Sequence, residues 1–198
     1  MTEYFKFHFL TCLFAFPLLA GCSATFVYDC CGSINPETLE VNRSREFVVD
    51  LKRKCNPSGV ILEAGKRYSF QVYTLSRIAD GRIKCMPPDY DADGEKCEPI
   101  GPDGYKTELL PWYMRFIMWF GESSRPLDTP DARWLELVGT VGHGNKVFFP
   151  VTQYPSNTKP YEAKETGEFY ALANDFPRLG RYGNNVGVLR VTVRHVGQ

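Results

Sequence analysis

The order of apolar and polar side chains predicts a series of short β-strands. Residues 68–73 alternate between the two classes with a period of two, which is typical of a strand buried on one face. Other short segments are rich in β-branched and apolar residues, which also favour strands. The strands that we predict are 46–51, 60–62, 68–73, 134–138, 147–149, 168–172 and 188–194.

Turn residues separate these segments. Asn56–Gly59 and Glu63–Lys66 have turn chemistry, and Gly142–Asn145 is expected to join two strands as a β-hairpin. The composition agrees, because the chain holds 17 glycines, 14 prolines and 14% aromatic residues. Many short strands joined by turns predict an all-β fold, an antiparallel β-sandwich of the jelly-roll type.

Leu109–Phe120 is the most apolar segment after residue 22, and its period does not separate a strand from a helix. Its large aromatic side chains are Trp112, Tyr113, Phe116, Trp119 and Phe120. We expect a strand in the core. The alternative is an exposed aromatic face that contacts a partner or a lipid.

The N-terminus predicts export and lipid attachment. An apolar stretch over residues 7–20 is about as long as the hydrophobic part of a signal peptide. It ends in Leu-Ala-Gly-Cys, which resembles the lipobox of bacterial lipoproteins, so Cys22 is expected to carry the lipid. We predict a signal peptide over 1–21, a lipidated tether over 22–42 and a β-sandwich domain over 43–198. A plain secretory signal and a short membrane anchor are the alternatives.

This anchor predicts where the protein resides. Two or three acyl chains hold a protein stably on a membrane, whereas one chain holds it only marginally. We therefore expect a lipid-anchored protein of the cell membrane or the outer membrane, facing the periplasm or the cell surface. Ser23 follows the cysteine, which favours the outer membrane by analogy with enteric lipoproteins.

Five further cysteines follow Cys22, and an oxidising compartment permits disulfides among them. Cys85 and Cys97 flank a polar loop and form the best candidate pair, which would stabilise the fold by roughly 3 kcal/mol. Cys55 is a candidate to pair with Cys30 or Cys31, and the sequence does not choose between them. Metal binding by these cysteines is disfavoured, because no Cys-x-x-Cys occurs and the chain has only 3 histidines.

Charge and motifs limit the function. The formal net charge is +0, so nothing favours nucleic acid as a partner. His143 lies in a glycine-rich turn and His195 lies near the chain end, and neither belongs to a Gly-x-Ser-x-Gly or His-Glu-x-x-His motif. We therefore expect a protein that is not an enzyme.

The chain over about 45–198 resembles the bacterial calcium-dependent galactophilic lectins, which are small galactose-binding β-sandwiches, and the resemblance is most specific in the C-terminal part. The resemblance rests on Ala171–Asp175, on Tyr-Gly-Asn-Asn at 182–185, on Gly187 and on the alternating strand that follows. It implies a single Ca²⁺ site. The implied ligands are the side chains of Asp175, Asn184 and Asn185 and a backbone carbonyl near Arg181, with sugar hydroxyls completing the shell.

Two features depart from that family. The spacing from Asp175 to Asn184 is longer here, which moves the carboxylate relative to the amides. No histidine lies between His8 and His143, where those lectins use one to hold galactose, so galactose specificity does not follow. A plain turn is the alternative interpretation of the loop, because Asp, Pro, Gly and Asn are common turn residues.

A second calcium candidate is Asp89–Gly94, which has the Asp-x-Asp-x-Asp-Gly spacing of a calcium loop. The position that holds the bidentate glutamate of an EF-hand is Ile100, so a solvated acidic loop is the alternative. Together these patterns predict a membrane-anchored, non-catalytic binding module for Ca²⁺ and carbohydrate. The alternative is a structural or protein-interaction lipoprotein of the envelope that uses the lectin-like fold without a sugar site.

Overall fold

A computed structural model of the chain describes residues 33, 35–80, 100–106, 112, 115–116, 119, 125–127, 129–142, 147–175 and 182–197. Nearly all regular structure among them is β-strand. The elements are β1 (Glu37–Thr38), β2 (Ser44–Asp50), β3 (Asn56–Leu62), β4 (Arg67–Thr74), β5 (Ala79–Asp80), β6 (Leu137–Val141), β7 (Phe148–Pro150), the 3-10 helix η2 (Val151–Gln153), β8 (Tyr161–Glu162), β9 (Gly167–Ala173), β10 (Asn185–Val186) and β11 (Val188–Gly197).

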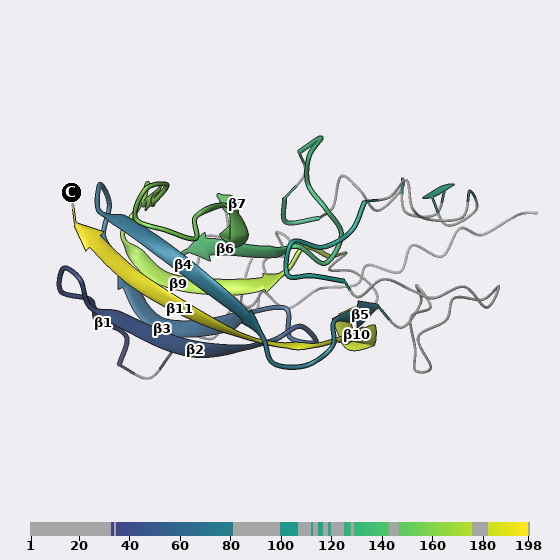
Figure 1. The fold of residues 1–198 in the computed structure, drawn as a ribbon, viewed down its shortest axis with the longest axis horizontal. Coiled ribbons are helices and arrows are strands. Elements are labelled where there is room, and N and C mark those ends of the chain that lie inside the picture. The colour runs from purple at the N-terminus through teal and green to yellow at the C-terminus, as the bar shows by residue number, and fades with distance from the viewer. Residues whose placement is uncertain are drawn as a thin grey trace, which may run out of the picture.

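The strands form two main sheets and one small pair (Figure 1). The first sheet has the order β1-β3-β9-β6-β7 and the second has the order β2-β11-β4-β8. β5 pairs with β10 at one end of the sandwich, opposite the end that carries the C-terminus (Figure 1). The described pairs are antiparallel except β1 with β3. The predicted all-β antiparallel sandwich is confirmed.

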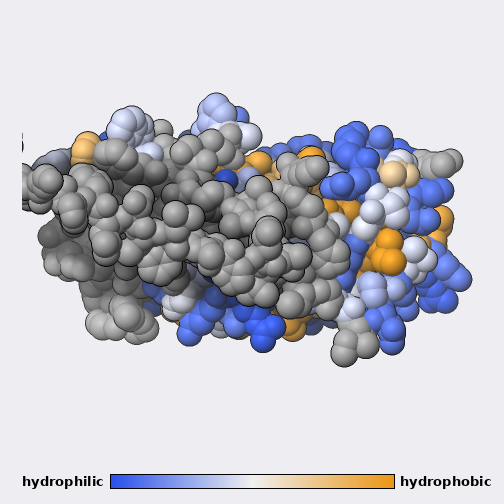
Figure 2. All heavy atoms as spheres, turned by 180° about the vertical axis from the view of Figure 1, so that it is seen from behind, coloured by the Kyte–Doolittle hydropathy of each residue, from blue (hydrophilic) through white to orange (hydrophobic). Residues whose placement is uncertain are grey.

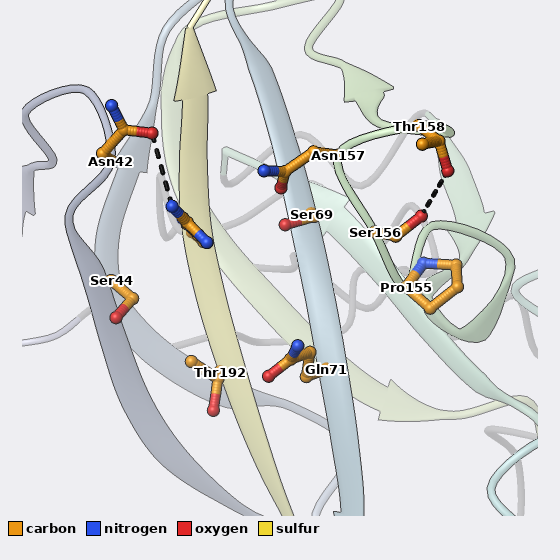
Figure 3. A pocket seen from close by; sticks show the side chains of 10 residues that line it. Asn42, Ser44, Ser69, Gln71, Pro155, Ser156, Asn157, Thr158 and Thr192 are labelled. Carbon is orange, nitrogen blue, oxygen red and sulfur yellow. Dashed lines mark hydrogen bonds between the residues drawn. The ribbon is translucent and has the colours of Figure 1, made fainter.

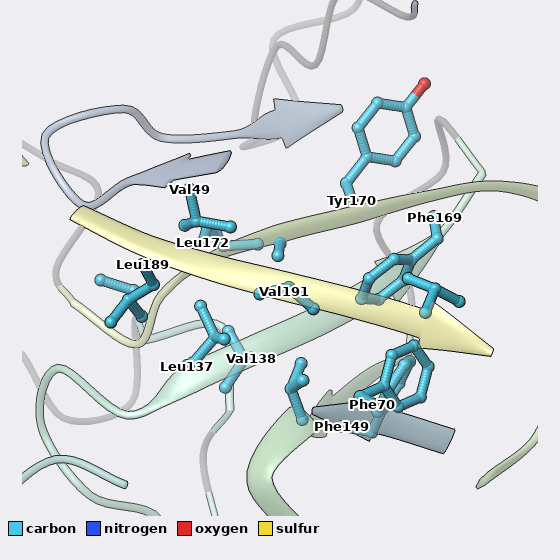
Figure 4. Close-up of a cluster of buried hydrophobic side chains, with 14 of the residues drawn as sticks. Val49, Phe70, Leu137, Val138, Phe149, Phe169, Tyr170, Leu172, Leu189 and Val191 are labelled. Carbon is cyan, nitrogen blue, oxygen red and sulfur yellow. The ribbon is translucent and has the colours of Figure 1, made fainter. Parts of the chain in front are cut away.

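Aromatic rings join the two sheets across the core (Figure 4). The ring centroid of Phe70 on β4 lies 4.9 Å from that of Phe169 on β9 and 5.7 Å from that of Phe149 on β7. Phe47 on β2 contacts Phe169 edge-on at 5.8 Å. These distances are typical of favourable aromatic pairs, and such buried rings supply much of the hydrophobic stabilisation of a small domain.

Strand β11 shows why the alternating pattern predicted strands correctly. Leu189, Val191 and Val193 are completely buried in the core. The residues that alternate with them, Arg190, Thr192 and Arg194, are less buried, and Thr192 lies on the outer side of the second sheet (Figure 3). Because successive side chains of a strand point to opposite faces, the period of two in the sequence becomes one buried and one polar face.

The predicted turn at Asn56–Gly59 is wrong, because these residues begin strand β3. The pairing of β3 with β9 shifts register between Pro57 and Ile61, which marks a bulge or irregularity. Gly59 lies in this interval with φ +70°, a conformation that side chains disfavour. Pro and Gly occur in strands at such positions, so turn-forming residues here distort a strand without ending it.

The predicted turn at Glu63–Lys66 is confirmed by a hydrogen bond of 3.0 Å from the amide of Lys66 to the carbonyl of Glu63. β6 and β7 pair antiparallel, although residues 143–146 between them lie outside the described residues. The strand predicted at 134–138 begins later, at Leu137. Leu135 has φ +58°, which is incompatible with a regular strand, so β6 starts only after it.

The core strand predicted at Leu109–Phe120 is wrong at each position of this segment that the structure describes. Trp112, Arg115, Phe116 and Trp119 have helical backbone. The aromatic side chains are 78%, 60% and 63% exposed at Trp112, Phe116 and Trp119. Their spacing of three and four residues places them on one helical face. The segment mixes aromatic and unbranched residues, so its period alone did not separate a helix from a strand.

The N-terminal region is described only from residue 33, so the signal peptide and Cys22 lie outside the described residues. β1 falls within the range predicted as a tether and pairs with β3, and Leu39 is buried in the core. Among the described residues, no helix is both long and apolar enough to cross a membrane. In the described part of the surface seen from behind, hydrophobic residues form small separate patches among hydrophilic ones (Figure 2).

Candidate functional site

The end of the sandwich that carries β5 and β10 gathers acidic and amide side chains from distant parts of the sequence. Asp175 follows the end of β9 by two residues. Asn185 begins β10 and is the antiparallel partner of Asp80 on β5. The chain thus brings residues about a hundred positions apart to one end of the fold (Figure 1).

Tyr182 fixes this arrangement from within. Its side chain is buried, and its hydroxyl donates to the carbonyl of Ala173 at 2.5 Å and lies 3.5 Å from the carbonyl of Asp175. The phenol therefore joins the segment before β10 to the end of β9. Asn184 and Asn185 follow Tyr182 closely in the sequence, so this contact ties their segment to the end of β9, which precedes Asp175.

The two amides have different partners. The Nδ2 of Asn184 donates to Oδ1 of Asp80 in a short hydrogen bond. The Nδ2 of Asn185 donates to the carbonyl of Leu51 at 3.2 Å. The Oδ1 of Asn185 is buried and accepts no hydrogen bond. A buried acceptor without a partner costs roughly 1–3 kcal/mol, so this atom needs an explanation.

A glycine permits the close packing behind Asn185. Gly187 has φ +141°, and a Cβ there would lie 2.8 Å from Cδ1 of Leu51 and 3.2 Å from Cα of Ile78. The carbonyl of Gly187 accepts from the amide of Leu51 at 3.1 Å. Because position 187 is a glycine, the turn between β10 and β11 can lie close to Leu51, which follows β2, and to Ile78, which precedes β5.

The electrostatics of this end are dominated by two buried carboxylates. Asp80 and Asp175 are 6% and 4% exposed. Burial raises the pKa of the Tyr105 phenol well above its ordinary value, and the negative charges of Asp80 and Asp175 raise that pKa further. Both carboxylates therefore act on the same phenol, whose hydroxyl is buried and makes no hydrogen bond.

The positive charge of Arg125 partly offsets these charges. Arg125 is 6% exposed, and its positive charge acts against the rise in the pKa of Tyr105. Its guanidinium carbon lies 4.5 Å from the ring centroid of Trp134, a cation–π contact. Arg125 also donates to the carbonyl of Ala132 at 3.4 Å.

These residues fit a hard cation. Ca²⁺ takes six to eight oxygen ligands from carboxylates, amide and backbone carbonyls and water. Asp80, Asp175, Asn184 and Asn185 offer carboxylate and amide oxygens, and the partnerless Oδ1 of Asn185 is an acceptor of the required kind. Among the described residues no three His, Cys, Asp or Glu side chains converge, so a site here must use amides together with its two acids.

The sequence-predicted ligands are brought together only in part. Asp175, Asn184 and Asn185 lie at the same end of the fold, whereas Arg181 lies outside the described residues. Asp80 was not predicted as a ligand. Its segment carries no motif, and its pairing with Asn185 is set by the tertiary fold, so no local signal in the sequence marks it. The second candidate, Asp89–Gly94, also lies outside the described residues.

The remaining candidates from the sequence are two histidines and the cysteines, and the structure gives His195 a packing role in the core. The ring of His195 is buried, stacks on Tyr68 with centroids 5.0 Å apart, and its Nδ1 lies 2.7 Å from the carbonyl of Leu39. His143 lies outside the described residues. Cys55 is disulfide-bonded, and its partner also lies outside them. The pairing of Cys85 with Cys97 and the choice between Cys30 and Cys31 stay predictions.

The chain has little similarity to known proteins. No protein-family model matches it, and no curated protein matches it. Among solved structures it is similar to one described as "EclA N-terminal domain; PllA-like lectin", with 18% sequence identity and a TM-score of 0.45, over 76% of this chain and 95% of that one. A similarity at this level assigns neither a family nor a ligand to the chain.

Proposed function

We propose that the protein is a non-catalytic binding module that holds one Ca²⁺ ion at the β5–β10 end of the sandwich. The carboxylates of Asp80 and Asp175 and the side-chain oxygens of Asn184 and Asn185 are the ligands. The observation that carries the proposal is the buried Oδ1 of Asn185, which accepts no hydrogen bond beside two buried carboxylates. A cation satisfies a buried oxygen that lacks a donor, whereas another buried acid or carbonyl would not.

A bound Ca²⁺ supplies a positive centre that can accept further oxygen ligands, including the hydroxyls of a sugar. The sequence pattern that ends in Asn184-Asn185 and Gly187 resembles calcium-dependent lectins, which supports carbohydrate as the ligand class. Asn184 now directs its Nδ2 to Asp80. Rotating its amide by 180° would present the oxygen to the cation.

The proposal includes the location of the module. The Leu-Ala-Gly-Cys sequence that ends at Cys22 supports a lipid anchor. The binding domain would then face the periplasm or the cell surface from the cell membrane or the outer membrane that holds it. Mass spectrometry of the protein purified from a bacterial envelope tests this, since Cys22→Ser should remove the acyl mass.

Thermal unfolding tests the calcium site. The full chain carrying Cys22→Ser is heated in EDTA and in excess Ca²⁺, with and without Asp175→Asn. A ligand present at a hundred times its Kd stabilises the native state by about 2.7 kcal/mol. We therefore expect a rise of several degrees in Tm with Ca²⁺, since each kcal/mol shifts Tm by roughly 2–4 °C in a domain of this size.

The control is Asp131→Asn, which makes the same charge change at an exposed position. It should keep the calcium-dependent rise, whereas Asp175→Asn should lose it. An equal rise in all three proteins would place the ion elsewhere, and no rise in any would reject the proposal. A glycan array in Ca²⁺ and in EDTA then tests the carbohydrate.

The exposed aromatic side chains of Trp112, Phe116 and Trp119 favour a second candidate, a lipoprotein that binds another envelope protein. Large exposed apolar surface often marks a protein interface. A photo-crosslinking residue at Phe116 in intact cells should capture one defined protein. The same residue at Val147, which is 47% exposed, is the control. Equal capture at both positions, or capture of lipid alone, would reject this candidate.

A further inference from the structure

The outer face of the second sheet carries a lattice of polar side chains. Arg194 on β11 lies between Ser44 on β2 and Ser69 on β4 in the strand register. Two residues earlier, Thr192 lies next to Gln71 on β4. Neighbouring side chains on one face of a sheet are about 5 Å apart, so these groups form a continuous polar floor.

A loop turns this floor into a groove (Figure 3). The carbonyl of Tyr154 accepts from the amide of Phe70 at 2.8 Å, which fixes the loop after η2 beside β4. Within that loop the hydroxyls of Ser156 and Thr158 lie 2.7 Å apart. The groove has a volume of about 660 Å³, within the usual range for small-ligand sites. It is lined by Asn42, Ser44, Ser69, Gln71, Pro155, Ser156, Asn157, Thr158, Thr192 and Arg194.

The side chains that line the groove are mostly polar and uncharged. Hydroxyls and amides dominate, and Arg194 is the one charged residue of the lining. No described carboxylate lies within 4.0 Å of the Arg194 guanidinium, which instead donates to Oδ1 of Asn42 at a long 3.4 Å. The nearby carboxylate of Glu46 accepts from the hydroxyl of Thr192 at 3.1 Å. The groove therefore holds a cation that lacks a counter-ion.

We infer that this groove binds an acidic saccharide independently of calcium, with the acidic group on Arg194 and the sugar hydroxyls on the surrounding side chains. Serine, threonine and amide groups both donate and accept hydrogen bonds, as sugar hydroxyls do. Pro155 is the one apolar residue of the lining, so hydrogen-bonding groups outnumber apolar ones around the ligand. Arginine binds a carboxylate or sulfate through two parallel N–H donors, and this bidentate contact fixes the orientation of the anion.

The groove and the calcium candidate are separate sites. Arg194 lies near the end of β11, and Asn185 lies before its start, so the strand separates them (Figure 1). No residue of the groove lining belongs to the set Asp80, Asp175, Asn184 and Asn185. Either site can therefore fail without the other, and the inference does not rest on the proposed calcium function.

Isothermal titration of the full chain carrying Cys22→Ser tests the groove. The probes are trigalacturonate and its neutral counterpart galactotriose, both titrated in EDTA. We expect the acidic trisaccharide to bind more tightly. Arg194→Gln should weaken its binding by roughly 10-fold or more, which corresponds to the loss of a charge-assisted hydrogen bond. The same substitution should leave the weaker neutral binding unchanged.

Two further variants keep the test decisive. Arg53→Gln removes an exposed arginine outside the groove and should leave binding unchanged, which controls for net charge. Asn157→Ala, on the loop, should weaken both trisaccharides. Three results would overturn the inference: no binding of trigalacturonate in EDTA, an equal loss in Arg53→Gln and Arg194→Gln, or binding that requires Ca²⁺ and disappears in Asp80→Asn.

Discussion

The two ends of strand β9 each bury a carboxylate, and the protein surrounds them differently. At the start of the strand, Glu168 accepts from the backbone amide of Ser33 at 3.0 and 3.2 Å, from that of Gly59 at 3.0 Å and from the hydroxyl of Tyr170 at 3.0 Å. Burial alone would raise the pKa of Glu168, but these hydrogen bonds lower it below its ordinary value.

Beyond the other end of the strand, Asp175 shares its surroundings with a second buried carboxylate, Asp80. Both act on the phenol of Tyr105, and the neighbouring Oδ1 of Asn185 accepts no hydrogen bond. This acceptor-rich end holds Asp80, Asp175 and the amide oxygen of Asn185, which accepts no hydrogen bond, whereas backbone amides and a hydroxyl donate to the carboxylate of Glu168. The difference indicates a structural role for Glu168, and the Oδ1 of Asn185 at the other end is the atom on which the proposed cation site rests.

The largest expected effect comes from adding a third acid to the acceptor-rich end. Asn185→Asp buries another carboxylate at a position that is 0% exposed. We expect a loss of about 3–5 kcal/mol in the free energy of unfolding in EDTA, because the new charge has no compensating partner. Calcium should restore most of this loss, since it supplies the counter-charge. Urea unfolding with and without Ca²⁺ measures both, and an equal loss in the two conditions would contradict the cation site.

A smaller effect is expected at the donor-matched end. Glu168→Gln removes the negative charge to which Ser33, Gly59 and Tyr170 donate hydrogen bonds. The new amide nitrogen is itself a donor and cannot accept from them. We expect a loss of roughly 2–3 kcal/mol, the range for hydrogen bonds to a charged group. The loss should be the same in EDTA and in Ca²⁺. Glu165→Gln, an exposed position two residues before β9, should change stability little. A loss in the free energy of unfolding of Glu168→Gln that differs between EDTA and Ca²⁺ would mean that calcium acts at both ends of β9, which would contradict the proposed difference between them.

The pH dependence sharpens the assignment of Glu168. Its folded-state pKa is lowered, so the stability it contributes is present above the unfolded pKa of about 4.3 and is lost as pH falls through the folded value. The difference in free energy of unfolding between wild type and Glu168→Gln should therefore shrink below about pH 4. Unfolding curves across pH 2–7 measure it, with Glu165→Gln in parallel. A difference that stays constant across this range would show that the charge is not involved.

The smallest expected effect on stability is that of Asp80→Asn in EDTA. Replacing one of two neighbouring buried carboxylates with a neutral amide relieves repulsion while keeping the shape, so we expect a change of less than about 1 kcal/mol, or a slight gain. Unfolding in urea measures it. A loss as large as that of Glu168→Gln would mean that the charge of Asp80 stabilises the fold without Ca²⁺, which would make the two ends alike.

The sequence predicted the strands that alternate over several residues, because one buried face imposes the pattern. It did not predict the two-residue strands β5 and β10, which are too short to show a period. For the same reason Asp80 was missed, since only its pairing with Asn185 places it in the site. The turn predicted from Asn56–Gly59 failed because glycine and proline also serve irregular strands.

The central claim is that the acceptor-rich end binds one cation, and direct titration of Ca²⁺ tests it most closely. Calorimetry on the full chain carrying Cys22→Ser should show binding of one ion that Asp80→Asn weakens strongly and Asp131→Asn leaves unchanged. Asp80 is the informative position, because the structure alone brings it to the site. Undiminished calcium binding in Asp80→Asn, or no binding in the parent protein, would contradict the account.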